Sequence, residues 1–250
     1  MVSSLWRRLS SRGSNPSVRS VMPILHSQNQ IDLLVCAATL PELQTFSNDL
    51  KILELSEEKP FVLHEGRGFL LTGVGIPATF PTLLHYLQLV HPKQILNIGI
   101  AGAYPSSELH IGDVVMGTSE VYGDLGFELP EEPHFQSLTD SRFAGTLYAT
   151  PFPLITPEVW EQGSKLKGRG CTVNSCTGTE STGRLRERLF EVHFESMEGA
   201  AVAQIGQRLG IPVCEVRSIS NIASRRDMRF ENIRIALHAL RDYLQACQEN

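Results

Sequence analysis

The stretch QILNIGIAGA, residues 94–103, is the clearest structural signal in the chain. Residues 94–100 form a short, mostly apolar run, and glycines stand at positions 99 and 102 near its end. An apolar run of this length that ends in glycine is typical of a strand buried on both faces of a parallel sheet. The stretch therefore predicts a central strand of an α/β fold, whose carboxyl end lies at residues 99–103.

The segments on either side repeat this pattern. Helices are expected at residues 78–90, 197–209 and 233–244 and after Pro41, and apolar strands at residues 31–37, 69–74, 114–116, 170–174 and 213–219. This alternation predicts a single-domain three-layer α/β/α sandwich with a mixed, largely parallel central sheet. Residues 123–157 contain several prolines, and we expect a long loop region there, broken by one short element.

Composition narrows the class of protein. The chain has 250 residues, enough for one large core, and its formal net charge is −5. The negative charge gives no reason to expect a nucleic-acid partner, and no apolar run reaches the ~18 residues of a membrane span. The five cysteines are odd in number and do not match zinc-ligand spacing. We therefore expect buried free thiols in a reducing cytoplasm, and no metal.

The first 26 residues differ from the rest, because they contain four arginines and several serines but no acidic residue. This composition is compatible with an organelle transit peptide, although the apolar stretch of a secretory signal is missing. The interpretation we favour is a disordered extension, or a start assigned too early with Met22 as the true start. We therefore expect a disordered extension over residues 1–29 and one domain over residues 30–248.

Polar and glycine residues gather at the expected carboxyl ends of the strands, where ligands bind in open α/β sheets. These candidates are Glu42, Gly75, Gly99, Glu198 and Asn221. Each also has a purely structural explanation, since acidic residues favour first helical turns, asparagine caps helices and glycine makes tight turns. Residues 99–102 lack the G-x-G-x-x-G spacing and the P-loop lysine, so dinucleotide and triphosphate binding are unsupported.

Four short motifs, in their order and spacing, resemble the nucleoside phosphorylase/nucleosidase superfamily. They are Ile98-Gly99-Ile100-Ala101-Gly102, Ile111-Gly112-Asp113-Val114-Val115, Ser196-Met197-Glu198-Gly199-Ala200-Ala201 and Val216-Arg217-Ser218-Ile219-Ser220-Asn221. The resemblance extends over residues 31–244. Within the superfamily the chain resembles methylthioadenosine/S-adenosylhomocysteine nucleosidases. It is more similar still to the futalosine hydrolases of the menaquinone pathway, through Thr172-Val173-Asn174-Ser175, Gly123-Asp124-Leu125-Gly126 and Asn221.

This resemblance implies cleavage of a ribosyl–purine bond through an oxocarbenium-like transition state. As catalytic residues, Glu42 would orient and deprotonate the attacking water, and Asn221 would stabilise the departing base. Glu198 would hold the ribose hydroxyls, and Met197 would pack against the ribose. The remaining members of the expected substrate-binding set are Gly75, Gly99 and Asn174. The resemblance implies no cofactor.

Asn221 departs from the adenine-specific nucleosidases, which carry an aspartic acid at this position. An aspartic acid accepts from the adenine amino group and protonates N7, whereas an amide supplies no proton but donates at one atom and accepts at the other. That suits a 6-oxopurine, so we expect futalosine as the substrate, with hypoxanthine and dehypoxanthine futalosine as the products. The alternatives are a nucleosidase acting on methylthioadenosine, S-adenosylhomocysteine or aminofutalosine, a purine nucleoside phosphorylase, and a non-catalytic nucleoside-binding protein.

The attacking group and the 5′ substituent are harder to predict. No arginine or lysine stands beside the glycine turns, and Arg67 precedes its strand, so it is expected at the opposite edge of the sheet. A phosphate dianion would lack a partner there, which favours hydrolysis. Candidates by position for the 5′ pocket are Tyr122, Phe127, Phe152 and Arg217. The resemblance implies at least a homodimer, since related enzymes complete the 5′ pocket from a neighbouring subunit.

Overall fold

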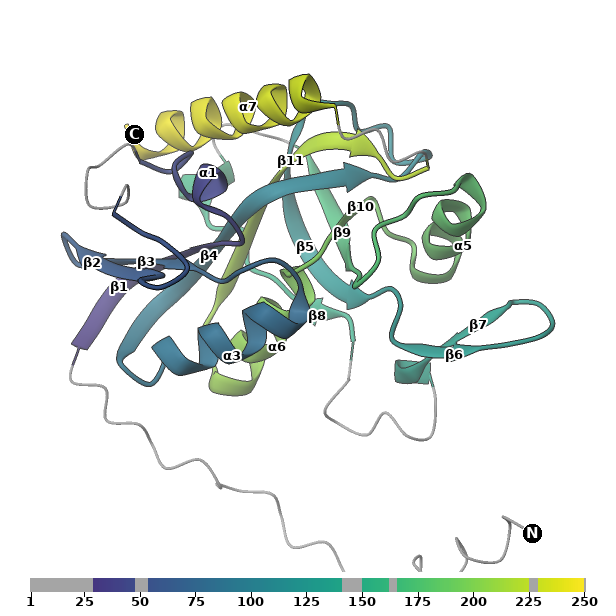
Figure 1. Ribbon diagram of the computed structural model, residues 1–250, viewed down its shortest axis with the longest axis horizontal. Coiled ribbons are helices and arrows are strands. Elements are labelled where there is room, and N and C mark those ends of the chain that lie inside the picture. Colours follow the sequence, from purple (N-terminus) through teal and green to yellow (C-terminus); the bar gives the residue numbers. More distant parts are fainter. Residues whose placement is uncertain (1–28, 48–53, 141–149, 162–165, 225–228, 250) are drawn as a thin grey trace, which may run out of the picture.

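The chain folds into the expected α/β/α sandwich in a computed structural model, which describes residues 29–47, 54–140, 150–161, 166–224 and 229–249 (Figure 1). Nine strands of the described residues form one mixed sheet, in the order β10-β9-β5-β11-β4-β1-β3-β2, with β8 paired to β5. These strands are β1 (Asn29–Ala37), β2 (Phe61–His64), β3 (Arg67–Leu71), β4 (Val90–Ala103), β5 (Val114–Tyr122), β8 (Phe152–Pro153), β9 (Lys167–Thr172), β10 (Phe194–Ser196) and β11 (Val213–Ile222).

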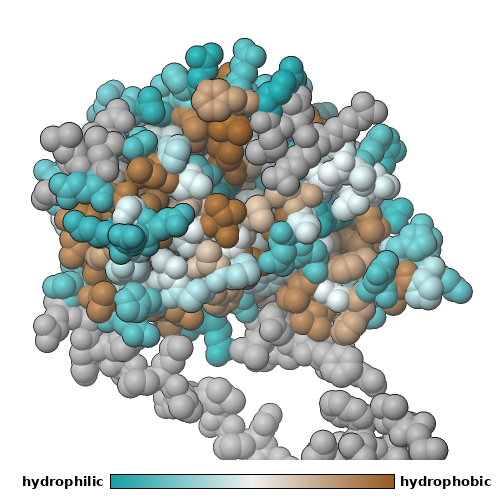
Figure 2. All heavy atoms as spheres, in the orientation of Figure 1, coloured by the Kyte–Doolittle hydropathy of each residue, from teal (hydrophilic) through white to brown (hydrophobic). Residues whose placement is uncertain are grey.

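Helices cover both faces of this sheet. They are α1 (Leu40–Leu43), α3 (Ile76–Tyr86), α4 (Glu158–Glu161), α5 (Glu180–Phe190), α6 (Gly199–Leu209) and α7 (Phe230–Gln248). On one face, α3 and α6 pack on an aliphatic cluster that includes Leu83, Val202 and Ile205. On the other face, α1, α4 and α7 enclose a second cluster that includes Trp160 and Leu240. Figure 2 shows hydrophilic side chains along the upper edge, over the outer side of α7, as an amphipathic helix requires.

The long strands β4 and β11 lie side by side in the middle of the sheet. They pair in parallel along most of their length, and the end of β4 also pairs with β10 in antiparallel. Strands β10, β9, β5, β11 and β4 are therefore each paired to the next in a closed ring. A register shift interrupts the β11–β4 ladder between Ile219 and Asn221. Such a bulge bends a strand and redirects its side chains, and here it lies directly before Asn221.

Several expected element bounds are wrong. The strand expected at 94–100 extends over Val90–Ala103, so it is longer at both ends and also includes Gly102. The region 123–157 contains more than one element: β6 (Gly126–Glu128) and β7 (Phe135–Ser137) form a hairpin, followed by the 3-10 turn η2 (Leu138–Asp140) and β8. The helix expected from residue 197 begins at Gly199.

The first strand begins one residue before the expected domain start at residue 30, and the last helix ends at the expected residue 248. Strand β1 begins at Asn29, so this residue belongs to the sheet and not to the expected extension. The rest of that extension, residues 1–28, lies outside the described residues. Helix α7 ends at Gln248. No helix of the described residues is long and apolar enough to cross a membrane. The five cysteines form no disulfide, and all but the half-buried Cys176 are buried.

Candidate active site

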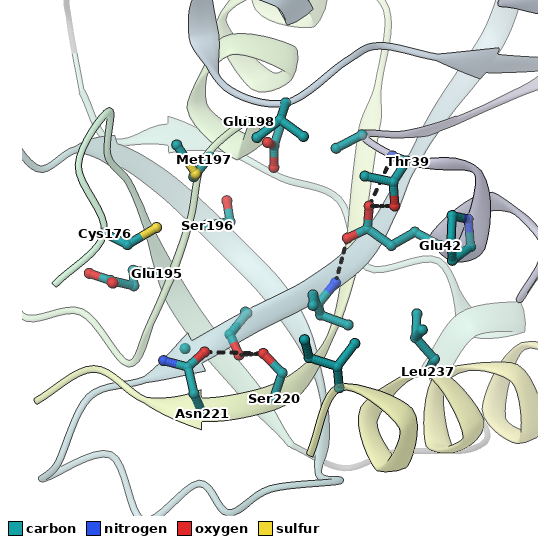
Figure 3. Close-up of a pocket in the computed structure, with 17 residues that line it drawn as sticks. Thr39, Glu42, Cys176, Glu195, Ser196, Met197, Glu198, Ser220, Asn221 and Leu237 are labelled. Carbon is teal, nitrogen blue, oxygen red and sulfur yellow. Dashed lines mark hydrogen bonds between the residues drawn. The ribbon is translucent and has the colours of Figure 1, made fainter. Parts of the chain in front are cut away.

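A cavity of about 490 Å³ lies at the carboxyl ends of the central strands. Its volume is within the range of small-molecule sites, about 300–1,000 Å³. Four of the expected site residues line it: Glu42, Met197, Glu198 and Asn221. Figure 3 shows that Glu42, the adjacent Met197 and Glu198, and Asn221 come from three separate segments and point toward a common centre. Apolar side chains, among them Val74, Ile233 and Leu237, complete the wall.

Glu42 is held firmly at the start of a single-turn helix. It is the third residue of α1, after the N-cap Thr39, and Pro41 stands between them in the first turn. Its Oε2 accepts from Thr39 N at 3.0 Å and from Thr39 Oγ1 at 2.7 Å, and its Oε1 accepts from Ile100 N at 3.0 Å. Threonine and glutamate three residues apart form a capping box, a local signal that supports the helix start. Glu42 therefore has a structural role and still faces the pocket.

Glu198 stands at the N-cap of α6, but it does not cap the helix. The first amides of α6 are satisfied by other groups: Gly199 N donates to Ser196 Oγ at 3.2 Å, and Ala200 N donates to Thr172 Oγ1 at 2.6 Å. The Glu198 carboxylate is thereby free to face the pocket, where its Oε1 accepts from Gly75 N at 2.9 Å. Helix capping therefore does not explain why a glutamate stands at position 198.

Gly75 and Gly99 contribute through their backbones. Gly75 has φ 85° and ψ 163°, a conformation essentially restricted to glycine, and it directs its N–H to Glu198. A Cβ at Gly99 would overlap Arg217 Nη1 and approach Glu42 Oε1 to 2.6 Å. Neither glycine is among the residues that line the cavity. Gly99 instead leaves space for the side chains of Arg217 and Glu42 beneath the cavity.

Arg217 corrects two expectations. It reaches Gly99 from β11, so a cation does lie beside a glycine of β4, although none is near in sequence. It is also fully buried and absent from the cavity lining, so it does not face a 5′ substituent. Its Nε donates to Glu215 Oε1 at 2.8 Å, and its Nη1 lies 3.9 Å from Glu198 Oε2. Burial raises the pKa of Glu198, while the Arg217 charge and the Gly75 N–H oppose that rise.

Asn221 lies across the pocket from the two carboxylates, beside Ser220 (Figure 3). Ser220 Oγ is 3.1 Å from Asn221 Oδ1 and 3.2 Å from Ala101 O. A Cβ at Gly102 would lie 3.0 Å from Asn221 Nδ2, so glycine at this position leaves room for the amide. Asn221 is therefore positioned by the bulge in β11, by the Ser220 hydroxyl and by the missing side chain at residue 102.

Asn174 does not line the cavity. Its N and Nδ2 donate to the carboxylate of Asp124, at 2.6 and 3.1 Å. This contact joins two of the segments that carry the resemblance, while the substrate-binding role of Asn174 stays a prediction. Among the 5′ candidates, Tyr122 and Phe152 contact each other in the core, with Tyr122 Oη donating to Gln204 Oε1 at 2.7 Å. Phe127 is partly exposed on β6, away from the cavity lining.

Sequence reasoning missed Glu195, which lines the same cavity. Its carboxylate accepts from Thr177 N at 2.7 Å, Thr177 Oγ1 at 2.6 Å and Tyr104 Oη at 3.0 Å, and Arg186 Nη1 lies 3.4 Å away. These contacts hold the segment that carries Cys176, another lining residue, against β10. Sequence patterns offered no usable signal, because Glu195 stands between Phe194 and Ser196 in a strand too short for periodicity to reveal.

Fold and site together define a class: an α/β/α protein whose pocket is lined by the carboxylates of Glu42, Glu195 and Glu198 and by the amide of Asn221. The chain belongs to the Phosphorylase superfamily, whose family model matches residues 32–247. It is 31% identical to a futalosine hydrolase of Thermus thermophilus, over 74% of this chain and 85% of that one. A second futalosine hydrolase, from Streptomyces coelicolor, is 32% identical over 59% of this chain, and the chain spans only 62% of its length.

Nucleosidases of another name are similarly related. The chain is 30% identical to a 5′-methylthioadenosine/S-adenosylhomocysteine nucleosidase of Halalkalibacterium halodurans, over 64% of this chain and 70% of that one. Among solved structures, the native futalosine hydrolase of Helicobacter pylori superimposes with a TM-score of 0.63 at 17% identity, over 88% of this chain and 97% of that one. At this identity the structural likeness extends to the fold alone.

Proposed function

We propose that this protein is a purine nucleosidase that hydrolyses futalosine and releases hypoxanthine. Membership of the superfamily, and relatives named as two kinds of nucleosidase, support the cleavage of a purine nucleoside. The pocket supports it independently, because it presents a carboxylate for water, a second carboxylate for ribose and an amide for the base. The contacts of these residues support the roles that the resemblance implies for them.

Glu42 is the general base in this proposal. A carboxylate has about four acceptor sites, and three donors from Thr39 and Ile100 occupy part of that capacity. The remaining capacity faces the pocket, where it orients a water and takes its proton as the water attacks the anomeric carbon. Positioned proton transfer of this kind contributes about 10²- to 10⁴-fold in rate.

Glu198 holds the sugar. The Gly75 N–H donates to its carboxylate at 2.9 Å and the Met197 backbone adds a weaker contact, so acceptor sites remain for the 2′- and 3′-hydroxyls. Positive charge develops on the ribose as the bond to the base breaks, so two negative carboxylates around the ribose stabilise the transition state. Met197, whose Cε packs near Gly75, forms the apolar surface beside the sugar.

The observation that carries the choice of hypoxanthine is Asn221 and its contact with Ser220. When the Ser220 hydroxyl donates to Oδ1, the atom left to meet the base is Nδ2, a hydrogen-bond donor. Hypoxanthine offers acceptors at N7 and O6, whereas adenine carries a donor amino group in place of O6. A donor at this position therefore favours a 6-oxopurine. The second candidate, methylthioadenosine/S-adenosylhomocysteine nucleosidase, is favoured by relatives at 30% identity.

Hydrolysis is favoured over phosphorolysis by the state of Arg217. Its guanidinium is buried and paired with Glu215, and it lies close to Glu198. A phosphate beside Gly99 would find the Arg217 guanidinium already paired with a carboxylate, and the surrounding carboxylates would repel it. Water, which carries no charge, has no such repulsion to overcome.

The test is base release by the purified protein from futalosine, inosine and methylthioadenosine, with and without phosphate. We expect hypoxanthine from futalosine without phosphate. Release of adenine alone, or release that requires phosphate, contradicts the proposal. Asn221→Asp is expected to move the preference toward adenine nucleosides. Ser220→Ala keeps the amide but removes the hydroxyl that orients it, so it should weaken the preference for hypoxanthine without reversing it.

A further inference from the structure

Two glutamates lie beyond Arg217, on the core side of the pocket. Glu120 on β5 and Glu215 on β11 are both fully buried. Neither lines the cavity, and the roles proposed above use neither. Burying carboxyl groups in the interior has a large desolvation cost, so two of them together call for a physical explanation.

The contacts of the two residues are unequal. Glu215 Oε1 accepts from Arg217 Nε at 2.8 Å and from Asn97 Nδ2 at 3.2 Å. Glu120 Oε2 accepts from Thr172 Oγ1 at 2.8 Å. The other oxygen of each, Glu120 Oε1 and Glu215 Oε2, is buried and meets no donor group among the described residues. Each carboxyl group of the pair therefore has one oxygen atom without a hydrogen-bond donor.

Glycines make the space that this pair occupies. A Cβ at Gly199 would overlap Glu120 Oε1 and lie 2.6 Å from Glu215 Oε1, so both carboxyl groups pack against the same residue. A Cβ at Gly170 would overlap Glu120 Oε1, and one at Gly117 would lie 3.0 Å from Glu215 Oε2. The glycine that follows Met197 and Glu198 is thus explained by the buried pair behind it.

A single proton shared by the two carboxyl groups would remove the repulsion between them and supply the missing hydrogen-bond donor. Two adjacent buried carboxylates repel each other, whereas one protonated carboxyl donates to the other. The proton belongs on Glu120, because Glu215 already accepts from a guanidinium and an amide. Burial and the neighbouring Glu215 raise the pKa of Glu120 well above its usual range. The other titratable groups facing Glu120 are Arg217 from β11 and Cys171 from β9, while α6 presents Gly199.

Arg217 connects this pair to the pocket. Its Nε is held by Glu215, and its Nη1 lies between Gly99 and the carboxylates of Glu198 and Glu42. We propose that Glu120 is a positioning residue: as a neutral acid it donates a hydrogen bond to Glu215, which then holds Arg217 beneath the two pocket carboxylates. With Glu120 neutral, Glu215 balances Arg217, and the net negative charge faces the ribose. The kinetic part of this inference rests on the proposed nucleosidase function.

The test compares Glu120→Met with Glu120→Gln. Methionine has a similar size but cannot donate a hydrogen bond to Glu215, and we expect kcat to fall about tenfold or more, with a smaller change in KM. Glutamine supplies a neutral donor and an acceptor, and should restore kcat to within about threefold of the wild type. In the wild type, kcat should also fall as rising pH ionises Glu120. That alkaline limb should be absent in Glu120→Gln.

Two outcomes overturn the proposal: full activity in Glu120→Met, or equal loss in both variants, which would mean that an ionised Glu120 is needed. Infrared spectroscopy keeps the test valid if Glu120→Met does not fold. A carbonyl band of a protonated carboxyl group is expected in the wild type above pH 7, and should be lost in Glu120→Gln; a wild type without that band contradicts the shared proton. This measurement needs no substrate, so its result is separate from a failure to find nucleosidase activity.

Discussion

Glu195 and Glu198 stand three residues apart, and both are buried and line the same pocket. The Glu195 carboxylate accepts from three donors within 3.0 Å, and Arg186 adds a charge at 3.4 Å. The Glu198 carboxylate accepts from the Gly75 N–H at 2.9 Å and has a weaker backbone contact with Met197, and the Arg217 guanidinium is 3.9 Å away. Burial and position therefore do not separate the two. What separates them is the acceptor capacity that the protein leaves unused.

This difference assigns opposite tasks to the two glutamates. The acceptor sites of the Glu195 carboxylate are occupied by Thr177, Tyr104 and Arg186, and these contacts fix the wall of the pocket. Glu198 keeps capacity for a ligand and is held by few contacts. If the tasks are separable, substitutions at the two glutamates should affect stability and catalysis differently.

Replacing Glu195 by alanine should mainly destabilise the protein. Removing one partner of a buried ion pair costs up to about 3–5 kcal/mol, and here it leaves Arg186 with Asp124 Oδ2, 3.9 Å away, as its remaining carboxylate. Urea denaturation followed by circular dichroism measures this free energy of unfolding. Glu198→Gln is the matched control and should unfold close to the wild type. Equal stability of the two variants would remove the distinction drawn above.

Glu198→Gln should mainly affect catalysis. It loses charge-assisted hydrogen bonds to the ribose hydroxyls, each worth about 1.5–3 kcal/mol, so kcat/KM should fall about 100-fold or more. Steady-state kinetics of base release measures this. Glu195→Gln, which keeps a polar side chain of the same shape, should lose much less. Wild-type kinetics in Glu198→Gln would show that this carboxylate does not hold the sugar.

Gly75→Ala should disturb Glu198 indirectly. No atom is closer than 3.7 Å to an added Cβ, so the obstacle is the backbone conformation at φ 85°, with a strain of about 1–3 kcal/mol. Relief of that strain should move the Gly75 N–H away from Glu198 and raise KM about tenfold. Gly66→Ala, at φ 74° in the turn between β2 and β3, is the control. It should lower stability and leave KM unchanged; a raised KM there would point to a general effect of strain.

The pH dependence of KM should report Glu198. A protonated Glu198 has lost the charge that holds the hydroxyls, so binding weakens as pH falls through its pKa. Because burial raises that pKa, KM should begin to rise at a pH above the ordinary glutamate value of about 4.3. The rise should be absent in Glu198→Gln and present in Glu195→Gln. A KM that stays constant down to the ordinary value would contradict a raised pKa.

Local sequence patterns predicted much of this molecule. The buried apolar runs gave the central strands, and the alternation with helices gave the sandwich, because burial on both faces leaves a readable mark on each strand. Four of the seven expected site residues line one cavity. Helix α5 was missed because its apolar residues are few, and β10 because three residues carry too little periodicity.

Tertiary structure alone decided how charges are distributed around the site. Arg217 stands four residues before Asn221 in the motif, yet it lies beneath Gly99 and faces the core. The contact of Glu120 with the Glu215–Arg217 pair joins β5 to β11, and no local pattern encodes such long-range pairing. The sequence by itself assigned Glu42, Glu198 and Asn221 to the pocket, but it did not reveal Glu195. Only the packed structure decided which of them keep open acceptor sites, because that depends on donors from distant strands.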